Sequence, residues 1–144
     1  MKKSMFNWGA SLSAALVCGA ILCGCCHSEV ATDPINAGPA QVGTMVPAAS
    51  GQARNSGYYL FNLWPLYTGH PEKYNRHDYH AFYDDIKPEV NSGMLLQAMR
   101  KLYGVEKLAQ VEHSESSVGF FSLWIVWRRH ITTTAIGLKT VKRK

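Results

Sequence analysis

Cysteine is confined to the start of this 144-residue chain, where all four cysteines lie between positions 18 and 26. None follows from His27 onward, whereas a disulfide framework would distribute cysteines through the fold. The same absence excludes a cysteine-based zinc site in the body of the chain. Hydrophobic residues make up 47% of the chain and charged residues 17%, so its composition is not that of a chain disordered throughout.

The sequence also lacks the short motifs of common catalytic sites. It contains no Gly-x-Ser-x-Gly motif and no glycine-rich phosphate-binding loop. The neighbouring carboxylates of Asp84 and Asp85 would point to opposite sides of a strand, so they do not form the acid pair of a glycosidase. We therefore expect a protein that is not an enzyme, and an uncharacterised hydrolase is the last of three alternatives.

Acidic residues are absent before Glu29, and this opening segment has the pattern of an export signal. Lys2 and Lys3 precede an uncharged stretch, residues 4–26, that is rich in alanine, leucine, glycine and valine. A short basic start followed by an apolar stretch is typical of a secretory signal peptide. A permanent membrane span is the weaker interpretation, because it needs about 20 strongly apolar residues and this stretch is rich in small and polar ones.

The end of this apolar stretch resembles the signal sequence of bacterial lipoproteins. Their lipobox has the form Leu-x-Gly/Ala-Cys, and the chain reads Leu22-Cys23-Gly24-Cys25 at this point. The resemblance implies removal of residues 1–24 by cleavage between Gly24 and Cys25, with acyl chains, palmitate among them, on Cys25. Cys26 is an alternative lipidation site, but it would place Cys23 where the motif prefers leucine.

The same resemblance implies a destination. In lipoproteins an aspartate directly after the lipidated cysteine marks retention in the inner membrane, and this chain has Cys26 at that position. We therefore expect an outer-membrane lipoprotein that faces the periplasm and contacts the membrane through the acyl chains on Cys25. Two or three acyl chains give stable anchoring, whereas a single chain binds only marginally.

Aromatic residues are absent from positions 28–56, which are rich in alanine, glycine, proline, serine and threonine. Pro34, Pro39 and Pro47 oppose a continuous helix or a central strand in this stretch. So little bulky apolar surface does not offset the entropy lost on ordering. The sequence therefore predicts that residues 25–56 are a lipidated cysteine followed by a disordered, flexible linker.

The composition changes at Gly57, and residues 57–144 are expected to form a small α+β domain with a basic C-terminal tail. Nine of the sixteen aromatic residues lie between Tyr58 and Tyr83, and we expect most of them in the core. The pattern predicts a small, mostly antiparallel sheet of four or five strands with one packed helix. The expected strands are residues 58–64, 79–86, 105–111, 120–127 and 131–141, with a polar loop at 113–117.

The helix is expected to start at Asn91 or Ser92 and to end before Gly104. Its apolar stripe consists of residues at helical spacing, namely Leu95, Leu96, Met99, Leu102 and Tyr103. The stripe is expected to face the core.

The mature domain resembles small, uncharacterised envelope lipoproteins of bacteria. The residues that carry this resemblance are Gly57-Tyr58-Tyr59-Leu60-Phe61, Trp64-Pro65-Leu66 and the stretch from Phe120 to Leu138. The resemblance implies no activity, so no functional residues follow from it.

Histidine supplies the best candidate for chemistry in the domain. His77 and His80 lie three residues apart, with His70 upstream. Imidazole is a ligand for zinc, copper and nickel, and a His-x-x-His pair can present both rings on one side of a helix. No third ligand is evident, so no metal or other cofactor is assigned. A metal-binding or small-ligand-binding periplasmic module is the second alternative.

Basic residues gather at the end of the chain, where the first interpretation is a solvated tail and the second is a site for an anionic partner. Removal of residues 1–24 takes away two lysines and no acid, which leaves a net charge of +3. Residues 128–144 contain six basic residues and no acid. A basic end of this kind suits an anionic polymer, and export argues against nucleic acid. The expected function is that of an exported, lipid-anchored cell-envelope protein that acts by binding or by structural interaction with an envelope protein or an anionic polymer.

Overall fold

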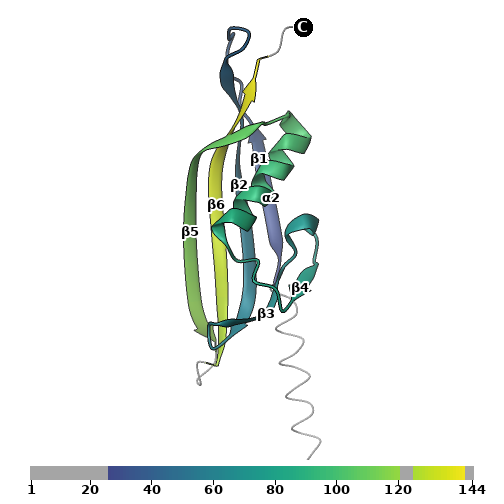
Figure 1. The fold of residues 1–144 in the computed structure, drawn as a ribbon, viewed down its shortest axis with the longest axis vertical. Helices are drawn as coiled ribbons and strands as arrows, with labels where there is room; N and C mark the ends of the chain where they lie inside the picture. Colours follow the sequence, from purple (N-terminus) through teal and green to yellow (C-terminus); the bar gives the residue numbers. More distant parts are fainter. Residues whose placement is uncertain (1–25, 121–124, 142–144) are drawn as a thin grey trace, which may run out of the picture.

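The computed structural model describes residues 26–120 and 125–141, which form one antiparallel sheet of six strands and one long helix (Figure 1). The strands run in the order β4-β3-β2-β6-β5, and β1 pairs with the remaining part of one edge of β2. The elements in chain order are β1 (Ser28–Pro34), β2 (Met45–Leu60), β3 (Trp64–Gly69), the short 3₁₀ helix η1 (Pro71–Lys73), β4 (Tyr79–Ala81), α2 (Pro88–Tyr103), β5 (Lys107–Phe120) and β6 (Val126–Thr140).

The predicted fold class, a mostly antiparallel sheet with one packed helix, is confirmed. The sheet has six strands and not four or five. The predicted signal peptide, residues 1–24, lies outside the described residues, as does the basic end of the chain at 142–144.

The prediction of a flexible linker at 25–56 is wrong, because β1 and most of β2 come from this stretch. Its small residues serve close packing: a Cβ atom on Gly51 would lie 2.7 Å from the Met99 side chain of α2. Pro34 ends β1, and Pro47 lies at a register shift where β2 meets β6. The domain boundary expected at Gly57 therefore falls inside the longest strand.

Both edges of β2 are paired over nearly its whole length. β6 pairs with one edge from Met45 to Leu60, while β1 and then β3 share the other edge, with the change between Asn55 and Gly57. The outer edge of β1 is covered by Asn75, whose side-chain amide donates to the Val30 carbonyl at 3.0 Å and accepts from the Val30 N–H at 2.8 Å. β2 is the centre of the sheet, and its backbone groups are satisfied through long-range partners.

The helix crosses one face of the sheet, and the core lies between them (Figure 1). It begins earlier than expected, since Lys87 and not Asn91 or Ser92 is its N-cap and Pro88 occupies the first turn. It ends at Gly104 in the left-handed conformation, as expected. Leu95 and Met99 of the predicted stripe are fully buried, whereas Leu102 is 62% exposed. The main buried cluster consists of Val30, Ala48, Ala53, Met94, Leu95, Ala98, Met99, Val105 and Ala135.

The second half of the chain forms a long hairpin, which the sequence predicted only in part. The polar stretch at 113–117 was expected as a loop but lies within β5, which is the strand at one edge of the described sheet. Polar residues suit a strand that faces water on its edge, so their polarity did not mark a loop. The expected strand at 120–127 is instead where β5 ends and β6 begins, and residues 121–124 are outside the described part of the chain. The expected strand at 131–141 lies within β6.

The aromatic-rich stretch at 58–83 also forms strands with bounds that differ from those expected. β2 ends at Leu60, and Phe61 and Asn62 adopt positive φ angles of 51° and 60° in the turn that leads to β3. The expected strand at 58–64 is therefore a hairpin turn with parts of two strands. The strand expected at 79–86 extends only over Tyr79–Ala81.

Candidate functional site

The predicted lipidation site lies at the edge of the described structure. Gly24 and Cys25 are outside the described residues, and Cys26 is the first residue within them. The Cys26 side chain is buried, with 6% exposure, and its Sγ lies 3.6 Å from the Tyr67 carbonyl of β3. The chain therefore enters the sheet one residue after Cys25.

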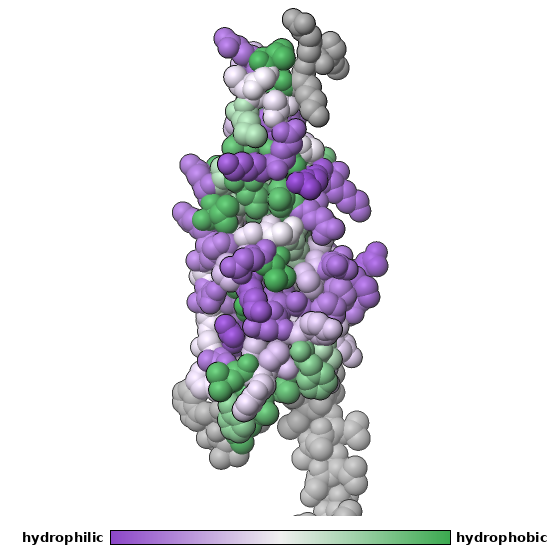
Figure 2. Space-filling model, in the orientation of Figure 1, coloured by the Kyte–Doolittle hydropathy of each residue, from purple (hydrophilic) through white to green (hydrophobic). Residues whose placement is uncertain are grey.

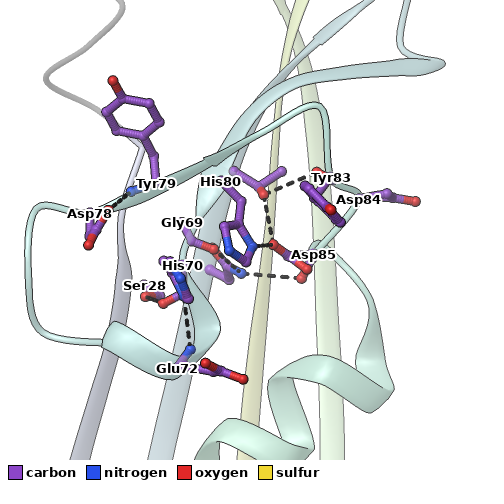
Figure 3. A network of polar contacts seen from close by, with 12 residues as sticks. Ser28, Gly69, His70, Glu72, Asp78, Tyr79, His80, Tyr83, Asp84 and Asp85 are labelled. Atoms are coloured by element: carbon purple, nitrogen blue, oxygen red, sulfur yellow. Dashed lines mark hydrogen bonds and ion pairs between the residues drawn. The ribbon is translucent and has the colours of Figure 1, made fainter.

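Two of the three candidate histidines come together beside β3 (Figure 3). The rings of His70 and His80 are tilted by 40° with centroids 3.7 Å apart. His80 Nδ1 lies 2.8 Å from Asp85 Oδ2, and His70 Nδ1 accepts from the Glu72 N–H at 3.3 Å. In both rings the Nδ1 position thus has a protein partner.

His77 does not join this pair. It is exposed in the loop before β4 and lines a shallow depression with His27 and Asn75. Across residues 26–120 and 125–141, no group of three histidine, cysteine or acidic side chains is arranged to hold a metal ion. Of the predicted metal ligands, the described structure therefore brings together only the imidazoles of His70 and His80.

The contacts around the histidine pair attach the 82–87 loop to the sheet (Figure 3). Asp85 also accepts from the Thr68 hydroxyl at 3.2 Å, and its carbonyl accepts from the Asn55 side chain at 3.2 Å. Asp84 accepts from the Tyr59 hydroxyl at 2.5 Å. The two carboxylates lie in a loop after β4 and not in a strand as expected, and each binds its own partner on the sheet.

Tyr59 is the most strongly perturbed titratable group in this network. Burial of its ring beside Ile86 and Ile131 raises the pKa of the hydroxyl far above its usual range, and the hydrogen bond to Asp84 raises it further. The Arg129 guanidinium lies 4.7 Å from the ring centroid and acts in the opposite direction. The hydroxyl therefore stays protonated and acts as a donor that holds the loop in place.

A second feature is an exposed apolar surface at the end of the molecule where β2 turns into β3, which we call the aromatic end. It consists of exposed side chains from this turn, β3 and the β4 region, namely Phe61, Leu63, Trp64, Tyr67, Tyr79, Phe82 and Tyr83. Figure 2 shows apolar side chains gathered at this lower end of the visible face. The prediction that most aromatic residues at 58–83 form the core is wrong, because of the nine only Tyr58 and Tyr59 are buried.

Ring contacts link the members of the aromatic end. Tyr67 packs edge-on against Tyr79 with centroids 5.2 Å apart, and it also contacts Phe82. Phe61 packs edge-on against Trp64 at 6.3 Å. The strand register places Trp64 opposite Leu60 and Tyr67 opposite Tyr58, so both exposed rings lie on the same side of the sheet. A register shift between these two pairs makes this possible, and no pattern in the sequence indicates it.

Helix α2 is not apolar and long enough to cross a membrane, and no other helix within residues 26–120 and 125–141 is. Comparisons of the chain with models of protein families, with curated proteins and with solved structures found no match.

Proposed function

We propose that this chain is an exported, lipid-anchored protein of the cell envelope, whose domain binds partners at the membrane surface. The lipid is attached at Cys25, and the destination is the outer membrane, with the domain in the periplasm. The observation that carries this proposal is the position of Cys26, which follows the lipobox directly and is packed against Tyr67 of the aromatic end.

This arrangement leaves almost no chain between the anchor and the domain. Consecutive Cα atoms lie about 3.8 Å apart, so Cys25 is within one residue of a buried position in the sheet. A lipid on Cys25 would therefore hold the aromatic end at the membrane. The packing of Cys26 also favours Cys25 over Cys26 as the lipidated residue, because an acyl group on the Cys26 sulfur would displace its contact with the Tyr67 carbonyl.

The chemistry of the aromatic end suits this position. Trp64 is 60% exposed and Phe82 is 74% exposed. Tryptophan and tyrosine rings favour the headgroup region of a bilayer, where one part of the ring is in an apolar environment and the other contacts water. Acyl chains contribute about 0.8 kcal/mol per buried methylene, so the anchor supplies the affinity and the rings supply the orientation.

The lipid anchor is tested with Cys25→Ala. The thioether to the diacylglyceryl group forms on a thiol, so this variant should keep its signal peptide, lose all fatty-acid label and run as a heavier band. Cys23→Ala is the matched control, because the middle lipobox position accepts small residues, and it should be labelled and processed normally. Labelling of growing cells with a clickable fatty acid reads both variants in one gel. Undiminished label on Cys25→Ala would contradict this site.

A further inference from the structure

We propose that the sheet face opposite α2 carries a binding site for an oxyanion of the phosphate class. On this face a hollow of about 300 Å³ is lined by His27, Arg54, Ser56, Val118, Arg128 and His130. Four of these six residues are basic, and none is acidic. The site goes beyond the proposed anchoring and does not depend on it.

Strand register explains how the hollow forms. Ser56 of β2 pairs with His130 of β6, and His27 lies on the other side of Ser56, where its carbonyl accepts from the Ser56 N–H at 3.2 Å. The small Ser56 side chain is therefore the floor between two imidazoles. Arg54 and Arg128 lie two positions to either side along β2 and β6, so their side chains project on the same face and close the two ends.

Basic side chains outnumber acidic ones around the hollow within the described part of the chain. Glu29 lies opposite Arg54 on β1, and its carboxylate is 3.7 Å from the His27 ring. No ion pair within 4.0 Å involves Arg54 or Arg128 among the described residues. The Arg128 Nε is buried and has no hydrogen-bond partner among the described residues. A buried N–H donor without a hydrogen-bond acceptor costs free energy, and arginine side chains without an ion pair attract anions.

The charge changes along this face. A small hollow next to the first is lined by Glu29, Ala31, Gln52 and Arg54, and the one beyond it is lined by Asp33 and Glu112 together with uncharged residues. Positive charge is thus concentrated at one position on the face. Two guanidinium groups provide paired N–H donors that match the oxygens of phosphate better than a single point charge does.

Two sources could supply such an oxyanion. One is a free phosphate or phosphate ester, and the other is the headgroup of an anionic lipid. The lipid is within reach because Arg128 pairs with Tyr58, which pairs in turn with Tyr67 of the aromatic end. The chemistry at the hollow is the same for both, and the experiment distinguishes them.

The test uses the full chain in non-ionic detergent micelles, with inorganic phosphate titrated by calorimetry. We expect saturable binding that Arg54→Gln weakens by about tenfold or more, because it removes charge-assisted hydrogen bonds. Arg100→Gln is the matched control, since Arg100 is exposed on α2 and should leave the affinity unchanged. Arg54 is also exposed, so its replacement should leave the melting midpoint intact, which a parallel thermal scan checks.

Mixed micelles with phosphatidylglycerol identify the source. If the headgroup occupies the hollow, this lipid should compete with phosphate and raise the melting midpoint of the wild-type chain but not of Arg54→Gln. Phosphate binding that phosphatidylglycerol leaves unchanged would identify a free oxyanion. Two results would overturn the site: no binding of either probe, or binding that Arg54→Gln and Arg100→Gln reduce equally.

Discussion

At the scale of single residues, a buried amide side chain joins the helix to the sheet by hydrogen bonds. The Asn91 side chain of α2 donates to the Ala53 carbonyl at 2.9 Å and to the Thr133 hydroxyl at 2.8 Å, and it is fully buried. The sequence placed Asn91 at the start of the helix, because asparagine is a common cap. Only the crossing of α2 over β2 and β6 shows that this amide is part of the core.

Replacement of this amide should destabilise the fold. Asn91→Ala removes both of these buried hydrogen bonds, so we expect the free energy of unfolding to fall by about 1–3 kcal/mol. Gln97→Ala lies on the exposed side of the same helix and should change it by less than about 0.5 kcal/mol. Urea unfolding of the two variants checks this. Equal stability of both would show that the amide contacts contribute nothing.

Tyr59 makes a separate prediction about pH. Its pKa is raised in the folded chain, so the folded state keeps this proton when the unfolded tyrosine, with a pKa of about 10, loses it. The stabilisation is thus fully present below about pH 10 and is lost as the pH rises above that value. Tyr59→Phe should therefore show a smaller loss of unfolding free energy between about pH 8.5 and 10.5 than wild type, measured by urea titration. An identical loss in both would contradict the perturbed hydroxyl.

At the scale of elements, the sequence predicted the helices and strands whose own residues have a recognisable spacing or terminating residue. Helix α2 was recognisable because Leu95 and Met99 recur at helical spacing and Gly104 ends it. The strands β1 and most of β2 were missed because their small residues match the composition of a linker. Their conformation depends on partners far along the chain, such as β6, and on a helix that approaches closely only where side chains are small.

Two glycines of the stretch once expected to be a linker test this difference. Gly51 lies in β2, where an added Cβ would meet the Met99 side chain at 2.7 Å and the Ala31 carbonyl at 2.8 Å. Gly38 lies in the loop between β1 and β2 with nothing within 4 Å. We expect Gly51→Ala to lower the unfolding free energy by about 1–3 kcal/mol, and Gly38→Ala to leave it nearly unchanged. Thermal melting compares the two, and equal midpoints would restore the flexible linker.

At the scale of the whole molecule, β2 separates two different ends. Met45 and Leu60 are its first and last residues, and 15 steps of about 3.3 Å separate them by about 50 Å. The aromatic end adjoins Leu60 and the entry point of the chain at Cys26. The sequence predicted an anchor and an aromatic-rich segment, but it did not predict that they coincide. That coincidence follows from the pairing of β3 with β2 beside the start of β1.

This arrangement predicts how the molecule lies on a bilayer. If Cys25 carries the lipid, Trp64 should enter the headgroup region, because it projects from the end of the sheet where the anchor attaches. Reconstitution into vesicles that contain brominated phospholipids should therefore quench its fluorescence. The mature chain, residues 25–144, contains three tryptophans, so the difference between wild type and Trp64→Phe isolates the signal of this ring.

The matched control places a tryptophan at the far end of β2. Met45 is 50% exposed, so Met45→Trp in the Trp64→Phe background introduces a ring of similar exposure about 50 Å from the anchor. Brominated lipid should not quench this added emission. Equal quenching at both positions would show that the domain lies flat on the membrane. Quenching at neither position in a chain that carries the fatty-acid label would mean that the lipid anchors the protein while the aromatic end stays in water. That surface would then be open to a protein partner.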